Sequence, residues 1–206
     1  MSRRDQPDHY SLRAQREGYR ARSVYKLEEL QRRFRLLRPG MRVLDVGAAP
    51  GSWSQYARRI LGAGGTIVAV DLSELPALEG VEGVRTVVGD AFDQAIIERI
   101  AGWGPYQAIL SDAAPRTTGN RGLDTARSAA LVEHVVVLCD RLLEPGGSIV
   151  AKLFQGGDER ALLQIVRDRF DTGRLIKPRA SRDDSFEAFL VGTGFRETVS
   201  GDTDDQ

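Results

Sequence analysis

Continuous apolar runs of strand length alternate with helical segments along this chain from residue 41 to residue 195. Strands are expected at residues 41–47, 65–71, 84–90, 106–112, 148–154, 174–180 and 187–195. Helices are expected at residues 22–37, 52–62, 94–102, 124–147 and 158–170. Unbroken apolar strands are typical of parallel sheets that are buried on both faces. The order therefore predicts an α/β fold, with a mostly parallel sheet and helices on both faces.

Carboxylates gather at the ends of the predicted strands. Asp71, Asp90 and Asp112 each end a strand, and the first strand carries Asp45. Because ligands of open α/β sheets bind outside the carboxyl ends of the strands, these acids should converge on one rim. A single aspartate at a strand end is often only a turn former. Three of them beside a glycine-rich first turn predict a ligand site.

The first turn reads DVGAAPGSW, and its glycines Gly47 and Gly51 allow a ligand to approach the backbone closely. The dinucleotide fingerprint G-x-G-x-x-G would need a glycine where Ala49 stands, and Pro50 stiffens the loop. This disfavours a nicotinamide dehydrogenase. A glycine loop surrounded by acids instead suits a cationic ligand that carries a ribose and a base, such as S-adenosylmethionine.

The formal net charge is zero, but the charges are unevenly distributed. Residues 1–38 hold 11 basic and 5 acidic side chains, which leaves 18 basic and 24 acidic side chains in the remainder. A basic N-terminal segment on an acidic body indicates either a solvated basic helix or a polyanionic partner.

We expect a flexible basic extension at residues 1–20, a single domain at residues 21–196 and a disordered acidic tail at residues 197–206. Cys139 is the one cysteine and there are two histidines, so neither a disulfide framework nor a metal site is expected. The polar N-terminus lacks the apolar core of a signal peptide, and no apolar run approaches the about 20 residues that span a membrane. We therefore expect a cytoplasmic protein, monomeric and not associated with membranes.

Four stretches together resemble the FtsJ/RrmJ (RlmE) family of ribosomal RNA ribose 2′-O-methyltransferases. They are ARSVYKLEEL, DVGAAPGSWSQYA, SDAAP and PGGSIVAKLFQG, and the resemblance runs in order from about residue 10 to residue 195. It implies a Rossmann-like fold that uses S-adenosylmethionine. It also implies that the substrate is a uridine in the A-loop of large-subunit ribosomal RNA, methylated on the assembled subunit.

The resemblance also implies site residues. The catalytic set of the family falls on Lys26, Asp112, Lys152 and Glu187. The cofactor residues of the family fall on Gly51, Trp53, Asp71, Asp90 and Asp112, and we add Gly47 of the glycine-rich turn. Lys152 is the expected proton acceptor, since it lies on the strand next to the one that Asp112 ends. A lysine can act as a base only when it is neutral. Asp112 would orient Lys152, while Lys26 and Glu187 would hold the ribose.

Two stretches depart from the family pattern. After SDAAP the family commonly has an asparagine and a small residue, where this chain has Arg116-Thr117-Thr118. Before Glu187 the family often has an Arg-Ser-Arg-like stretch, where this chain has SRDDSFE with Asp183 and Asp184. The second departure could alter RNA contacts near Glu187.

Two groups of basic residues are expected to contact RNA phosphates. They are Arg13, Arg16, Arg20, Arg22, Arg32, Arg33, Arg35 and Arg38 near the N-terminus, and Arg174, Lys177, Arg179 and Arg182 ahead of Glu187. Two other hypotheses stay open from the sequence. The RNA could be a transfer RNA or an mRNA cap, or the chain could be a non-catalytic RNA-binding assembly factor. The second hypothesis predicts a damaged catalytic set, whereas all four residues are present.

Overall fold

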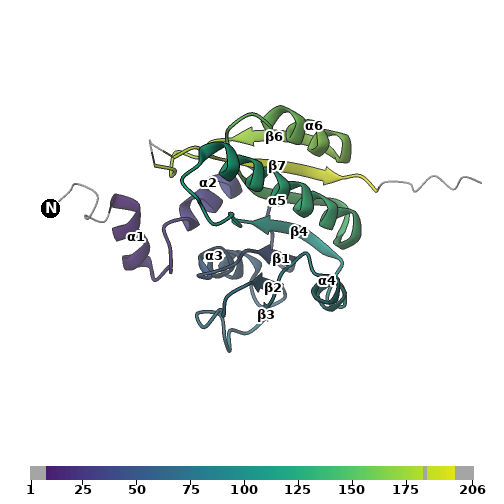
Figure 1. The fold of residues 1–206 in the computed structure, drawn as a ribbon. Coiled ribbons are helices and arrows are strands. Elements are labelled where there is room, and N and C mark those ends of the chain that lie inside the picture. Colours follow the sequence, from purple (N-terminus) through teal and green to yellow (C-terminus); the bar gives the residue numbers. More distant parts are fainter. Residues whose placement is uncertain (1–7, 183–184, 198–206) are drawn as a thin grey trace, which may run out of the picture.

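The computed structural model describes residues 8–182 and 185–197. Its strands form one seven-stranded sheet in the order β3-β2-β1-β4-β5-β7-β6 (Figure 1). The strands are β1 Arg42–Val46, β2 Thr66–Asp71, β3 Val84–Val88, β4 Tyr106–Ser111, β5 Leu143–Phe154, β6 Phe170–Ile176 and β7 Glu187–Phe195. Neighbouring strands from β3 to β5 are parallel, whereas β7 is antiparallel to both β5 and β6. The predicted α/β class with a mostly parallel sheet is confirmed.

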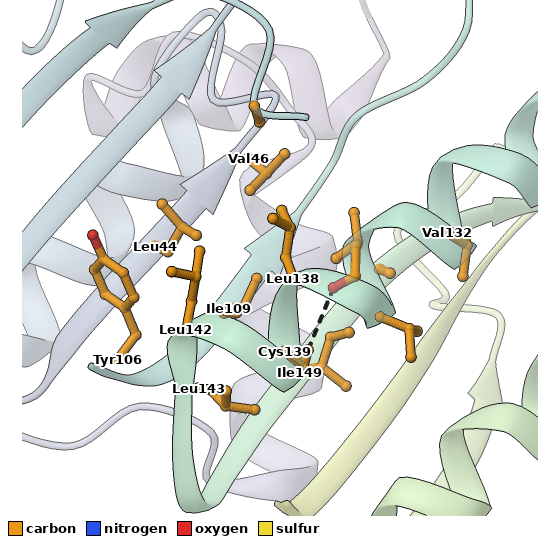
Figure 2. Packing of buried hydrophobic residues seen from close by; sticks show 14 of the residues in the cluster. Leu44, Val46, Tyr106, Ile109, Val132, Leu138, Cys139, Leu142, Leu143 and Ile149 are labelled. Carbon is orange, nitrogen blue, oxygen red and sulfur yellow. Dashed lines mark hydrogen bonds between the residues drawn. The ribbon is translucent and has the colours of Figure 1, made fainter. Parts of the chain in front are cut away.

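Helices cover both faces of this sheet. They are α1 His9–Glu17, α2 Val24–Phe34, α3 Ser52–Leu61, α4 Gln94–Ala101, α5 Arg121–Leu142 and α6 Glu159–Arg169. Successive side chains of a strand point to opposite faces, so Val43 of β1 packs with α2 and α3, and Leu44 packs with α4 and α5. Figure 2 shows the second of these two cores, in which Leu138, Cys139 and Leu142 of α5 lie against the sheet. Burial on both faces explains the unbroken apolar strands.

Two expected boundaries differ clearly from the structure. The helix expected at 124–147 ends at Leu142, because Leu143 is already extended and the residues up to Gly147 belong to β5. The last strand before β7 was expected at 174–180, but β6 starts at Phe170, directly after α6. The first error came from reading residues 124–147 as one element, and the second from expecting a loop between α6 and β6, which follow each other directly. Periodicity alone does not separate a buried helix from a buried strand.

The N-terminal helix α1 lies within the segment expected to be a flexible extension. Asp8 caps this helix by accepting a hydrogen bond from the backbone N–H of Ser11 (2.8 Å). Ala14 is buried in a small cluster with Tyr25 and Ala180, so α1 packs on the segments that flank Lys26 and Glu187. The expected acidic tail lies almost entirely outside the described residues. None of the helices in the described part of the chain is long and apolar enough to cross a membrane.

Candidate active site

The sheet brings the four predicted catalytic side chains together as two ion pairs. Lys152 Nζ lies 3.1 Å from Asp112 Oδ1, at the carboxyl ends of neighbouring strands β5 and β4. Lys26 of α2 donates a hydrogen bond to Glu187 Oε2 at the start of β7. The antiparallel register sets Glu187 opposite Phe154, two positions beyond Lys152, so the two pairs are neighbours on the same rim.

Both lysines of this cluster are nearly buried. Each lysine side chain is 9% exposed, and the carboxylates of Asp112 and Glu187 are 17% and 24% exposed. Burial acts to raise the pKa of Glu187, but the ammonium groups of Lys26 and Lys152 outweigh it, so the pKa is lowered below its usual value. Glu187 is therefore a carboxylate at neutral pH. The charge of the half-buried Glu187 is stabilised by the neighbouring lysines.

A cavity of about 330 Å³ opens beside the Lys152–Asp112 pair, and its lining includes Gly47, Asp71, Asp90 and Asp112. The backbone fixes two of these acids. Asp71 accepts hydrogen bonds from the N–H groups of Ala49 and Ser73, each 2.9 Å long. Asp90 accepts one from the N–H of Phe92 (3.0 Å). The strand-end aspartates Asp71, Asp90 and Asp112 thus converge on one rim, as predicted.

The glycine loop forms one wall of this cavity. Gly47 has φ +71°, and a Cβ atom there would lie 2.6 Å from the Cβ of Ala113, so no larger residue fits the turn. Gly51 has φ +103° and starts α3, but it does not line the cavity. Its left-handed backbone turns the loop into the helix, and its predicted contact with the cofactor stays a prediction.

The structure places the Trp53 side chain in the core rather than in the cavity. The indole is 2% exposed and packs against the ring of Phe189, with 5.7 Å between ring centroids. Its Nε1 donates a hydrogen bond to the backbone carbonyl of Ser23 (3.0 Å). Ser23 directly precedes α2, so this bond ties α3 to the helix that carries Lys26. The indole therefore helps to position Lys26 through its hydrogen bond to the start of α2.

A second cavity, also of about 330 Å³, lies on the other side of the cluster. Its lining residues are Arg22, Ser23, Lys26, Arg182, Ser185, Phe186 and Glu187. Asp112 thus lines an acidic cavity, whereas Lys26 and Glu187 line a cavity with two arginines. The four-residue cluster separates two sites of different charge, which is an arrangement for bringing two different molecules together.

A family profile described as FtsJ-like methyltransferase matches residues 19–195. The chain belongs to the FtsJ-like methyltransferase family. A protein named ribosomal RNA large subunit methyltransferase E from Treponema denticola is 47% identical over 191 residues, which cover 93% of this chain and 96% of the relative. A protein of the same name from Syntrophobacter fumaroxidans is 45% identical over 93% of this chain and 97% of the relative.

Solved structures resemble this FtsJ-like methyltransferase in fold. A protein assigned as a ribosomal RNA methyltransferase from Plasmodium falciparum aligns with a TM-score of 0.76 at 24% identity, over 87% of this chain and all of that chain. Fibrillarin from Aeropyrum pernix, with S-adenosyl-L-methionine bound, aligns with a TM-score of 0.58 at 15% identity, over 77% of this chain and 68% of fibrillarin. These likenesses support the Rossmann-like methyltransferase fold.

Asp45 is a buried acid beside the site that was not among the predicted site residues. It is fully buried in β1 behind the glycine loop of this FtsJ-like methyltransferase, where Oδ2 accepts a hydrogen bond from the Ser54 hydroxyl (2.6 Å). Its Oδ1 receives no hydrogen bond from the described residues. Burial raises the pKa of Asp45 to about 7, and the Ser54 hydroxyl lowers it less than burial and the charges of Asp112 and Asp71 raise it. The sequence signal for Asp45 is an acidic residue in the middle of an apolar strand.

The raised pKa of Asp45 makes stability depend on pH. Between about pH 4 and pH 7 the unfolded chain ionises Asp45 while the folded chain keeps its proton, so the free energy of unfolding falls by up to about 1.4 kcal/mol per pH unit as pH rises. Asp45→Asn removes this contribution. Its stability relative to the wild type should therefore increase across that window and level off above it.

Urea unfolding of both proteins at about pH 4.5, 6 and 7.5 measures this difference. Asp93→Asn, at an exposed acid preceding α4, is the matched control and should show no such trend. A pH-independent difference between Asp45→Asn and the wild type would contradict the burial argument.

Proposed function

We propose that this methyltransferase transfers a methyl group from S-adenosylmethionine to the ribose 2′-hydroxyl of a uridine in the A-loop of large-subunit ribosomal RNA. The observation that carries the proposal is the double position of Asp112, which lines the acidic cavity and pairs with Lys152. The names of the 45–47% identical relatives support large-subunit ribosomal RNA as the substrate. We further propose that the enzyme is a cytoplasmic monomer whose partner is the large ribosomal subunit.

The residues of the first cavity fit S-adenosylmethionine. A volume of about 330 Å³ is within the range of about 300–1,000 Å³ for small-molecule sites. Asp71 and Asp90 would accept hydrogen bonds from ribose hydroxyls and from the adenine amino group, and Asp112 would lie near the cationic end. Three carboxylates suit a ligand that carries a sulfonium and an amine. When bound, S-adenosylmethionine supplies the electrophilic methyl group.

The second cavity would hold the nucleotide to be methylated. Lys26 and Glu187 would position its ribose through hydrogen bonds to the hydroxyls, and Arg22 and Arg182 would offer cations to its phosphates. Lys152 would accept the proton of the 2′-hydroxyl as a neutral amine, so its ammonium proton must first pass to solvent, and Asp112 would hold the amine in place. Positioning and proton removal are the two contributions that a protein can make to such a transfer.

The distribution of lysine supports a chemical role for the two buried ones. Of the 29 basic residues only Lys26, Lys152 and Lys177 are lysines, and the other 26 are arginines. Two of the three lysines thus occur in the four-residue cluster. Arginine supplies a permanent positive charge, whereas lysine can also lose its proton. In a chain that uses arginine almost everywhere, lysine at position 152 fits a group that must accept a proton.

Ribose methylation of RNA is the direct test of the proposed function. Mass-spectrometric mapping of large-subunit ribosomal RNA should show one A-loop uridine that is 2′-O-methylated in cells with the protein and unmethylated in cells without it. The purified protein with S-adenosylmethionine should restore the methyl group on assembled large subunits. Methylation of transfer RNA or capped mRNA alone, or of no RNA, would contradict the proposal.

Lys152→Arg tests the proton acceptor. Arginine keeps the positive charge beside Asp112 but stays protonated, so methylation under single-turnover conditions should slow by about a hundredfold or more. Affinity for S-adenosylmethionine, measured by calorimetry, should stay close to that of the wild type. Lys177→Arg changes the exposed lysine outside the cluster and should leave both quantities unchanged. Turnover of Lys152→Arg near the wild-type rate would rule out Lys152 as the base.

Asp8→Asn tests the role of the arginines in binding RNA. Asp8 pairs with Arg22, and its Oδ2 also lies 3.6 Å from Nε of Arg182, so it competes with phosphate for both. Asparagine keeps the cap of α1 but removes the charge. The pair with Arg182 is exposed, and such a pair contributes about 0.2–1 kcal/mol, so freeing Arg182 should tighten RNA binding by up to about fivefold, and freeing the half-buried Arg22 should add to this gain.

A filter-binding titration of large-subunit ribosomal RNA at several salt concentrations measures this gain, which should shrink as salt rises. Glu79→Gln removes the same charge from the exposed loop between β2 and β3 and serves as the control. Equal effects of the two substitutions would show that Asp8 does not compete locally.

A further inference from the structure

An aromatic ring of the second cavity has no role in the chemistry described so far. Phe186 directly precedes Glu187 and lines the cavity together with Lys26 and Glu187. It is half-buried, so part of the side chain is open to the cavity. Phe186 belongs to the stretch SRDDSFE, in which the sequence departs from the family pattern. Its role must therefore be argued from its own surroundings.

Residues at the end of β5 hold Phe186 in place. The ring packs at 61° against the ring of Phe154, with 4.7 Å between the centroids, and Phe154 itself is buried at the end of β5. The backbone carbonyl of Phe186 accepts a hydrogen bond from the N–H of Gln155 (2.8 Å). Phe186 is thus supported by the same two strands that carry Lys152 and Glu187, so its position relative to them is set.

The planar guanidinium group of Arg121 lies over the Phe186 ring. The guanidinium carbon of Arg121, the first residue of α5, lies 5.4 Å from the centroid of the Phe186 ring. Arg121 is exposed, and within the described residues its guanidinium group makes no hydrogen bond or ion pair, so it is available to a ligand. An aromatic ring and a guanidinium group are the two kinds of surface on which unstacked RNA bases are bound.

We propose that Phe186, flanked by Arg121, is the stacking platform for the base of the nucleotide that is methylated. The inference rests on the proposed function and identifies how that site holds its substrate. In a nucleotide the base is attached to the carbon next to the one bearing the 2′-hydroxyl. A base stacked on Phe186 therefore stays beside the ribose that Lys26 and Glu187 position. Stacking reads the face of any base, so Phe186 contributes affinity and orientation rather than sequence discrimination.

Phe186→Leu is the decisive substitution. Leucine keeps an apolar contact with Phe154 but has no flat face, so kcat/KM on assembled large subunits should fall by roughly fivefold to a hundredfold. Phe186→Tyr keeps the ring and should retain most of the activity. Affinity for S-adenosylmethionine and the melting temperature should stay at the wild-type values in both variants. Phe34→Leu makes the same change outside both cavities and should leave kcat/KM unaltered.

A synthetic substrate separates stacking from packing. The large-subunit RNA is assembled by ligation with either a uridine or an abasic ribose at the methylated position and is incorporated into subunits. Loss of the base should slow methylation by the wild-type enzyme and have little further effect on Phe186→Leu, because each change removes the same contact.

The outcomes distinguish failure of the stacking platform from failure of the proposed function. Phe186→Leu activity within twofold of the wild type, equal losses in the leucine and tyrosine variants, or a full additional loss on the abasic substrate would overturn the stacking platform. Wild-type protein that methylates no ribose in the normal subunits would instead overturn the proposed function, and the platform with it.

Discussion

The ion pair between Lys152 and Asp112 is the interaction around which this site is organised. An ammonium group inside a buried strand is unfavourable unless a partner lies close, and Asp112 of the neighbouring strand is that partner at 3.1 Å. Parallel pairing of β4 and β5 brings the two together at the same rim. Asp112 also lines the acidic cavity, whereas the neighbouring Lys26–Glu187 pair lines the second one, so the two ion pairs lie between the two cavities.

Charge divides the rim into two halves. Asp71 and Asp90 of the first cavity are held by backbone N–H groups of nearby loops, and the arginines of the second come from the residues just before α2 and from the segment ahead of β7. A cationic ligand and a polyanionic RNA are thus attracted to opposite sides of one cluster. The neutral total charge of the chain conceals this separation, because the effect depends on where the charges lie.

Sequence patterns predicted most of the sheet but not its boundaries or all of the site. Unbroken apolar runs predicted the strands β1 to β5 along the chain, and the strand-end aspartates predicted the rim. The break between α5 and β5 at Leu143 was missed because one apolar segment supplies both. Trp53 was predicted to contact the cofactor. In the structure its indole packs in the core against Phe189, and the cofactor contact stays a prediction. The local signal for this packing is the apolar stripe of α3, in which Trp53, Ala57 and Leu61 follow one another at helical spacing and are buried.

The sequence by itself determined the fold class, the family and the kinds of group at the site, since these follow from local patterns and short motifs. Only the tertiary structure decided which groups meet. Lys26 and Glu187 are 161 positions apart, and no local preference couples them. They pair because α2 packs on the sheet through Trp53 and Ser23, and because β7 runs antiparallel to β5. Ion pairs, burial and the pKa of Asp45 depend on distances through space, which a linear pattern does not contain.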